Sequence, residues 1–208
     1  MKGDERVILN YDMIESPKLN SIVRECRALT LNRNDYSLIA KSFSRFLNWG
    51  EGTRDEMNRF HWDNCRVTSK EDGSLISCHL WKGRWHIQTR NSYGDGYVNN
   101  SIYTWCEIFE MALNPKELDW VEGRNYVFEL CSPYNQIVQL YEKPIVYLLS
   151  IFENGIEWTH EAVENFAEDF CLKRPVSYLC RDPFEVNSIV AREAERDMRY
   201  EGCVARDC

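Results

Sequence analysis

The chain has 208 residues, a formal net charge of −8 and a hydrophobic content of 44%. This length suits one large domain or two small ones, and the apolar content is enough for a sizeable core, which excludes a disordered protein. Proteins that coat nucleic acid are usually basic, so any contact with nucleic acid would need a local basic groove; the acidity otherwise fits a solvated surface. The N-terminal segment has no apolar signal region and no apolar run reaches membrane-spanning length, so we expect a cytoplasmic protein without membrane contact.

The cysteines and histidines do not form a metal-binding pattern. The chain has nine cysteines and four histidines, but none of the cysteines are spaced as C-x-x-C. The nearest approaches to a ligand pair are Cys78 with His79 and His61 with Cys65, and neither has the spacing of a structural zinc site. We therefore expect reduced, buried thiols.

Short runs rich in β-branched and aromatic residues recur along the chain and predict strands. The sequence Lys82-Gly83-Arg84 predicts a hairpin turn between two of them. The predicted strands cover residues 28–31, 37–46, 66–69, 74–80, 84–89, 126–130 and 145–152.

Three segments predict helices, covering residues 100–113, 159–170 and 182–196. Thr159 is placed to be the N-cap of the second. Asp182 with Glu185 fits a capping box for the third, and Pro183 suits the first helical position. Because no linker-like stretch divides the chain, we predict one α+β domain over residues 1–208, with mostly antiparallel strands and helices packed against them.

Residues 69–74 read S-K-E-D-G-S and lie between two predicted strands. A lysine in such a place can serve as a nucleophile once it has lost its proton, which makes Lys70 the candidate. Gly73 would let the backbone approach a bound nucleotide, and Asp72 would fix the turn. The alternative is a polar surface turn, so the motif alone does not decide between the two.

Further segments occur in a fixed order around this motif. Residues 24–27 read R-E-C-R and lead into a strand, and residues 128–130 read F-E-L and are followed by P-x-N-x-I-V at 133–138. Residues 201–204 read E-G-C-V, an E-G-x-V pattern at the start of a strand. Each segment alone could serve only the fold, because carboxylates at strand edges are common. Their joint occurrence in this order is improbable as an accident.

Together these segments resemble the phage-type RNA ligase 1 family, within the covalent nucleotidyltransferase superfamily of RNA ligases, DNA ligases and capping enzymes. K-E-D-G-S-L resembles motif I, F-E-L with its P-x-N-x-I-V extension resembles motif III, and E-G-x-V resembles motif IV. E-C-R resembles the upstream arginine element, and S-R-F-L-N-W-G-E at 44–51 resembles the K-F-F-N element. The resemblance covers about Tyr11 to Asp207.

The resemblance implies a role for each matching residue. Lys70 would be the nucleophile that takes AMP from ATP, Glu129 would hold the ribose or organise the site, and Glu201 would lie near the catalytic divalent metal. Arg45 stands where the family often has lysine, which keeps the charge but changes the geometry. The implied nucleotide-binding residues are Arg27, Arg45, Lys70, Arg90, Glu129, Glu201 and, by a looser alignment, Tyr11.

The implied function is ATP-dependent RNA end joining. Lys70 would form a lysyl-AMP intermediate, AMP would move to a 5′-phosphate on RNA, and a 3′-hydroxyl would then displace it, as in RNA repair. The implied cofactors are ATP and Mg²⁺ or Mn²⁺, because arginines and a metal ion would neutralise the phosphates. For a viral protein the implied compartment is the host cytoplasm.

The sequence also departs from the family pattern. Ala28 and Asn91 stand where the family has glycine, and Leu47 replaces a common phenylalanine. The K-x-K element of motif V and a C-terminal specificity domain are not found after Gly202, so we expect this chain alone to adenylate Lys70 weakly. Alternatives are a catalytically silent homologue that binds nucleotide or a partner, a GTP-using capping enzyme, or a DNA ligase.

Overall fold

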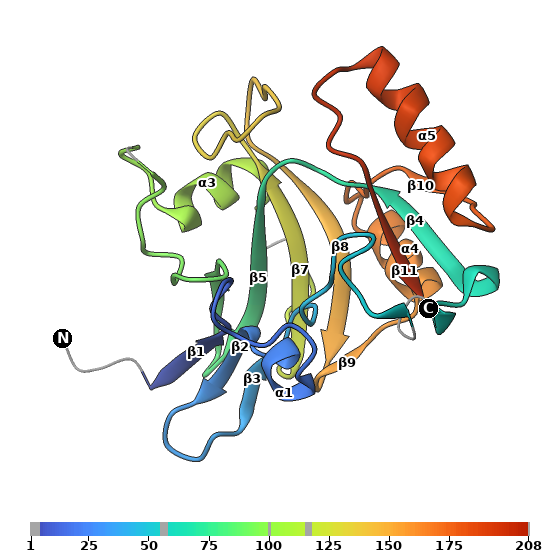
Figure 1. Ribbon diagram of the computed structural model, residues 1–208. Coiled ribbons are helices and arrows are strands. Elements are labelled where there is room, and N and C mark those ends of the chain that lie inside the picture. Colours follow the sequence, from blue (N-terminus) through green and yellow to red (C-terminus); the bar gives the residue numbers. More distant parts are fainter. Residues whose placement is uncertain (1–4, 55–57, 100, 115–117, 208) are drawn as a thin grey trace.

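The computed structural model describes residues 5–54, 58–99, 101–114 and 118–207. Its named strands form three sheets, with orders β1-β2-β3, β10-β4-β11 and β6-β5-β7-β8-β9. The five-stranded sheet lies at the centre of Figure 1, the β1-β2-β3 sheet below it to the left, and the β4 sheet to the right. The strands are β1 (Arg6–Asn10), β2 (Arg27–Asn32), β3 (Leu38–Ala40), β4 (Cys65–Ser69), β5 (Ser74–Trp81), β6 (Arg84–Gln88), β7 (Arg124–Cys131), β8 (Ile145–Glu153), β9 (Ile156–Glu157), β10 (Ser177–Tyr178) and β11 (Cys203–Asp207).

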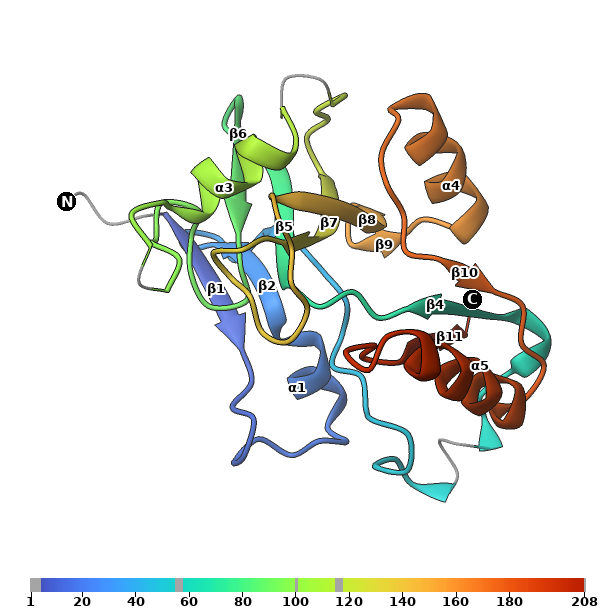
Figure 2. The ribbon, with the colours of Figure 1, turned by 90° about the horizontal axis from the view of Figure 1, so that it is seen from above.

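The main core lies on one face of the central sheet. Alternation along β7 sends Tyr126, Phe128 and Leu130 into this core, and leaves Glu129 on the opposite face. Two helices cover the core face: α3 (Trp105–Ala112), through Ile108 and Phe109, and α4 (His160–Asp169). Figure 2 shows both helices on the same side of the sheet, with β1, β2 and α1 (Ser21–Glu25) on the other side. The predicted α+β class is therefore confirmed.

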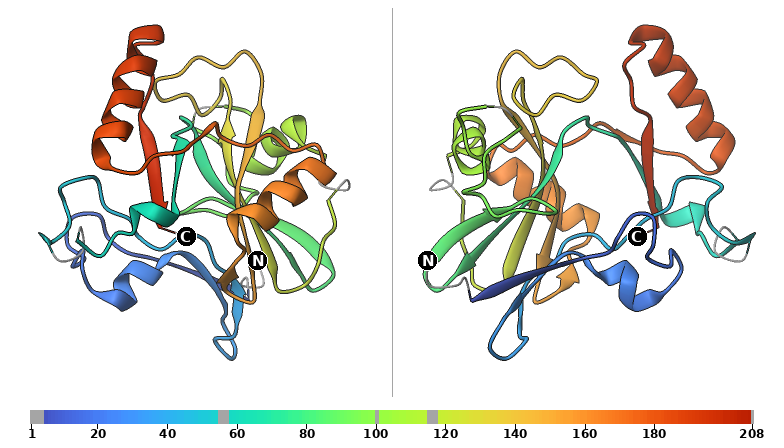
Figure 3. Two further views of the ribbon diagram at one scale, coloured as in Figure 1. Left: turned by 90° about the vertical axis from the view of Figure 1, so that its right-hand side faces the viewer. Right: turned by 60° about the vertical axis from the view of Figure 1, so that its left-hand side comes forward.

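The β4 sheet has its own small core against α5 (Pro183–Arg196). Cys65 and Val67 of β4 pack on this side together with Ile189 of α5. In Figure 3 this sheet stands apart from the central one, joined to it by the teal connection between β4 and β5. Residues of the S-K-E-D-G-S motif form that connection, so the motif links two separately packed sheets.

Several predicted elements differ from the observed ones. The predicted strand 37–46 is a strand only at Leu38–Ala40. The chain leaves the sheet there because Asn125 donates its side-chain amide to the carbonyl of Lys41, and Ser42 donates its hydroxyl to Arg27. The segment that follows runs along a cleft described below.

Two helix predictions also need correction at their starts. The predicted helix 100–113 begins only at Trp105, because Thr104 and Glu107 form a capping box; position 100 lies outside the described residues. In α5, Asp182 caps the amides of Phe184 and Glu185, but the Glu185 carboxylate accepts from the amide of Arg181, so the predicted capping box is wrong in its second bond.

Two other local predictions, a helix cap and a hairpin turn, are confirmed. Thr159 caps α4, and Lys82 and Gly83 form the two-residue β5–β6 turn with positive φ angles of 50° and 69°. Every cysteine among the described residues is free, but only Cys65, Cys78, Cys131 and Cys180 are buried and Cys171 is exposed, so the prediction of buried thiols is met only in part. Within those residues, no helix is long and apolar enough to cross a membrane.

Candidate active site

Lys70 lies where β4 ends and is held from the side of β11. Its backbone amide donates to the carbonyl of Gly202 at 2.9 Å, and its ammonium forms an ion pair with Glu201. The Lys70 side chain is 45% exposed and that of Glu201 20%. The antiparallel β4–β11 pairing therefore places the E-G-x-V segment beside the S-K-E-D-G-S segment, although 131 residues separate the two side chains in sequence.

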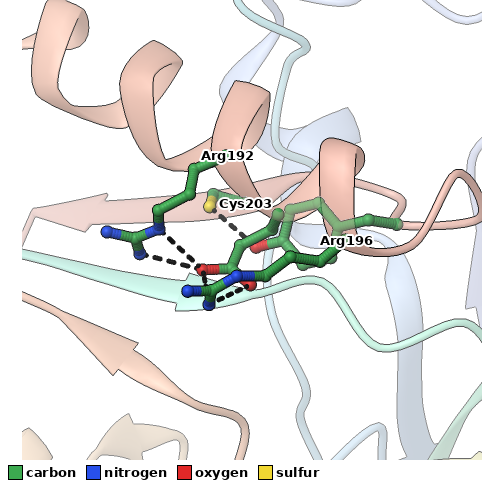
Figure 4. Close-up of polar contacts among 5 residues, drawn as sticks. Arg192, Arg196 and Cys203 are labelled. Carbon is green, nitrogen blue, oxygen red and sulfur yellow. Dashed lines mark hydrogen bonds and ion pairs between the residues drawn. The ribbon is translucent and has the colours of Figure 1, made fainter.

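Figure 4 shows polar contacts within α5 and at the start of β11, on either side of the turn that carries Glu201. The Tyr200 hydroxyl contacts the Cys203 sulfur at 3.2 Å. In α5, Arg192 and Arg196 both donate to the carboxylate of Glu193.

The P-x-N-x-I-V extension and the residue after it are hydrogen-bonded to the lysine loop, residues 69–74. Asp72 is buried and accepts from the backbone amides of Val138, at 2.7 Å, and Gln139. We predicted that Asp72 fixes its own turn, but its carboxylate fixes the loop to this distant segment.

Gly73 has a structural function that differs from the predicted one. A Cβ at this position would clash with the carbonyl oxygen of Leu130 and would lie 2.8 Å from its carbon and 2.9 Å from the Cys131 sulfur. The glycine therefore lets the loop approach strand β7. This contact does not test the predicted approach of the backbone to a nucleotide, which stays a prediction; Gly73 also lines the cleft described below.

Asn135, the asparagine of the P-x-N-x-I-V extension, joins the two strands next to Lys70. It is 3% exposed. Its side-chain amide donates to the carbonyl of Leu130 at 2.7 Å and to the Ser74 hydroxyl at 2.9 Å, and its oxygen accepts from the Ser132 hydroxyl. The P-x-N next to F-E-L was visible in the sequence, but the sequence alone did not indicate that Asn135 positions these strands.

Glu129 faces the same site from β7. Burial raises its pKa to about 8, with Glu201 and Glu71 adding to the effect and Lys70 and Arg27 opposing it. These interactions place Glu129, Glu201 and Lys70 within electrostatic reach of one another. Burial also raises the pKa of Glu71, against a hydrogen bond of 2.6 Å from the Ser69 hydroxyl. Burial therefore favours the protonated form of two carboxyl groups at this site, those of Glu129 and Glu71.

Arginines from distant segments gather around Tyr11. The Arg45 guanidinium lies 4.3 Å from the centre of the Tyr11 ring and that of Arg90 lies 4.4 Å from it. Arg90 also donates to the Tyr11 carbonyl at 3.0 Å, and Arg45 is 4% exposed. The loosely aligned Tyr11 is thus in direct contact with two of the other candidate residues.

Arg27 completes this group. Its guanidinium lies 4.5 Å from the centre of the Phe46 ring, and one of its buried nitrogens has no hydrogen-bond partner. Burial lowers its pKa, Tyr11 and Glu129 oppose that shift, and Arg90 adds to it. A buried guanidinium nitrogen without a partner is a donor that an anionic ligand can satisfy.

Ala28 occupies the position where the resembling family has glycine, and the backbone explains that preference. Its φ is +56°, in the left-handed region that favours glycine. Its amide donates to Asn10 and its carbonyl accepts from Gln88, so the conformation is held by neighbouring strands. The fold therefore places an alanine in a backbone conformation that is strained for it.

The candidate residues surround one open cleft of about 1440 Å³. Its lining includes Lys70, Arg27, Arg45, Arg90 and Glu129. Glu201 reaches it through its ion pair with Lys70, and Tyr11 through its contacts with the arginines. All seven residues selected from the sequence therefore lie at or directly behind one site.

The described residues of the site do not form a metal-ion site by themselves. Among the described residues, no group of three or more His, Cys, Asp and Glu side chains is placed to hold a metal ion. Mg²⁺ bound through one or two carboxylates and the phosphates of a nucleotide needs no such group. Glu201, beside Lys70, is the candidate carboxylate for that arrangement.

Comparison with known proteins decides the family. The sequence profile of a family described as RNA ligase matches residues 25–207. The chain belongs to this RNA ligase family. A protein of Autographa californica nuclear polyhedrosis virus whose name combines polynucleotide kinase and RNA ligase is 29% identical over 169 residues, covering 71% of this chain and 24% of that protein. RNA ligase 1 of bacteriophage TS2126 is 26% identical over 161 residues, covering 74% of this chain and 40% of that protein.

The chain therefore spans about a quarter and two fifths of the length of these two relatives of the RNA ligase family. Among solved structures, an archaeal ATP-dependent RNA ligase superposes with a TM-score of 0.62 at 16% identity, over 86% of this chain and 48% of that one. This likeness shows a shared nucleotidyltransferase fold. The family and fold expected from the sequence motifs are both confirmed.

Proposed function

We propose that the chain is the adenylyl-transfer domain of an ATP-dependent RNA ligase, with Lys70 as the nucleophile. The observation that carries the proposal is the meeting of Lys70, Glu201 and Glu129 at one cleft that Arg27, Arg45 and Arg90 also line. A lysine beside carboxylates, facing a group of arginines, suits attack on a phosphate.

In the first step the Lys70 nitrogen attacks the α-phosphate of ATP. An N–P bond forms, the bond between the α-phosphate and its bridging oxygen to the β-phosphate breaks, and pyrophosphate leaves. The ammonium proton must leave before the attack, and the paired Glu201 carboxylate is the nearest acceptor. Arg27, Arg45 and Arg90 would bind the phosphates and offset the charge that develops on them.

Two residues would act on the ribose and the metal. Glu129, on β7, faces the cleft with a hydrogen-bonding carboxyl group that would contact the ribose. Glu201 would share a divalent ion with the nucleotide phosphates once Lys70 has released it. The ion, Mg²⁺ or Mn²⁺, would supply charge neutralisation at the reacting phosphate.

The substrate assigned to this domain is RNA with a 5′-phosphate at one end and a 3′-hydroxyl at the other. The names of the relatives support an RNA substrate. In the second step a 5′-phosphate oxygen takes AMP from Lys70, and in the third a 3′-hydroxyl displaces AMP and forms the phosphodiester bond.

The test is covalent labelling with ATP that is radioactive at its α-phosphate, in the presence of a divalent metal. Label is expected on Lys70 and is expected to disappear in Lys70→Ala. Lys82→Ala is the matched control, because Lys82 is an exposed lysine in a surface ion pair with Glu5. Label on another lysine, or label that persists in Lys70→Ala, would refute the assignment, and a preference for GTP would favour a capping-type enzyme.

A further inference from the structure

A second group of basic side chains lies in the same cleft, further along the β4 sheet. Cys65 and Val67 of β4 face α5, so the alternating positions Arg66, Thr68 and Lys70 face the cleft. From Lys70 to Arg66 is four residues, about 13 Å along a strand. Arg66 therefore shares the cleft face of β4 with the nucleophile but lies well beyond the reacting phosphate.

Arg206 stands directly opposite Arg66 on the neighbouring strand. The two Cα atoms are register partners in the β4–β11 pairing. Like charges in this position destabilise a sheet unless other groups compensate. Arg206 is compensated: it forms an ion pair with Glu157, and its guanidinium lies 4.5 Å from the centre of the Phe43 ring.

A third arginine, Arg174, reaches the cleft from the segment between α4 and β10. Its side chain is 13% exposed and lies 3.8 Å from Glu164 and 3.3 Å from the His160 ring. Burial lowers the pKa of His160, and Arg174, Arg66 and Arg206 lower it further, whereas Glu164 raises it. Arg66, Arg174 and Arg206 therefore lie close enough to His160 to lower its pKa. We name these three residues the arginine triad.

Two of the three arginines in the triad have a carboxylate partner among the described residues. Glu157 pairs with Arg206 and Glu164 pairs with Arg174. Within the described part of the chain, no carboxylate forms an ion pair with Arg66, although its side chain lines the cleft beside a second arginine. In a protein with a net charge of −8, an unpaired arginine among like charges indicates a site for an anion.

We propose that the arginine triad binds a backbone phosphate of single-stranded RNA, with Arg66 as its main contact. This inference rests on the proposed function, because it assumes that RNA is the substrate that reaches Lys70. Arg27, Arg45 and Arg90 already surround the proposed nucleotide site at Lys70, and Arg66 lies about 13 Å further along β4.

The aromatic lining of the cleft favours a single strand over free polyphosphate. Trp49 is 61% exposed, lines the cleft and lies edge-on to Trp62, with 6.1 Å between ring centres. Exposed aromatic rings beside arginines form the stacking platforms on which unpaired bases bind, whereas a polyphosphate has no base to stack there.

The test measures binding of a fluorescent, 5′-phosphorylated single-stranded RNA at several salt concentrations. Arg66→Gln is expected to weaken binding roughly tenfold and to reduce the slope of log K against log salt by about 0.7. Arg66→Lys is expected to restore the slope. Arg84→Gln is the matched control, because it removes the same charge at an exposed position on β6 outside the cleft.

Binding of ATP and of inorganic pyrophosphate is measured with the same variants and is expected to be unchanged in Arg66→Gln. Weaker pyrophosphate binding with unchanged RNA binding would overturn the inference in favour of the nucleotide's own phosphates. If Arg66→Gln binds RNA with the affinity of the wild type and the same slope of log K against log salt, the inference is overturned and the proposed function stays intact. This holds whether or not the melting temperature of the variant is lower. Failure of the wild-type chain to bind RNA would overturn both.

Discussion

Replacing Asn135 by alanine tests whether the P-x-N-x-I-V extension positions the nucleophile. The substitution removes the bonds from Asn135 to the Leu130 carbonyl and the Ser74 hydroxyl and the one it accepts from Ser132. At about 1 kcal/mol for each bond, the free energy of unfolding should fall by about 3 kcal/mol. For a chain of this size that corresponds to a drop in melting temperature of roughly 6–12 °C.

Ser74 begins β5 just after the lysine loop, and Leu130 follows Glu129 on β7. Losing the link between them should also misplace Lys70 relative to Glu129, and a displacement near 1 Å costs on the order of 100-fold in rate.

The assays for this variant are thermal denaturation followed by circular dichroism, and ATP labelling at a temperature where variant and wild type are both folded. Asn34→Ala is the control, because Asn34 is exposed in the turn between β2 and β3. A melting temperature and a labelling rate both equal to wild type would refute the positioning function of Asn135.

Three other substitutions have defined outcomes. Burial raises the pKa of Glu129 from 4.5 to about 8, so between these pH values the folded protein holds a proton that the unfolded chain has released. The contribution of Glu129 to the free energy of unfolding is therefore fully present below about pH 4.5 and is lost as the pH rises through 8. Glu129→Gln should therefore flatten the fall in unfolding free energy between these pH values, measured by urea denaturation, and an unchanged slope would contradict the raised pKa. Gly73→Ala should destabilise the fold by roughly 1–3 kcal/mol, since its Cβ would meet β7, and a melting temperature equal to wild type would disprove the clash. Trp49→Ala should weaken RNA binding by about 1–3 kcal/mol without changing the salt slope; a changed slope would indicate a phosphate contact instead.

Local sequence predicted the elements whose residues alternate or cap without help from distant segments. The strands around Lys70, the Lys82-Gly83 turn and the Thr159 cap follow from period-two patterning and turn or cap chemistry. The strands β1, β9 and β10 and helix α1 were not predicted; β9 and β10 have two residues each, too few to show a period. The strand predicted for residues 37–46 failed because Asn125, far away in sequence, binds the Lys41 carbonyl.

The sequence alone also determined the family and the identity of the candidate nucleophile, since a lysine next to a D-G turn and the order of the other motifs are properties of the chain itself. Only the tertiary structure decided how those motifs meet. It placed Tyr11 between two arginines, assigned Asn135 and Asp72 to holding the lysine loop, and set Arg66 opposite Arg206. The physical reason is that these contacts depend on strand register and on the packing of one sheet against another. Both join residues that are 34 to 140 positions apart in the chain (45 − 11 and 206 − 66), which no local pattern encodes.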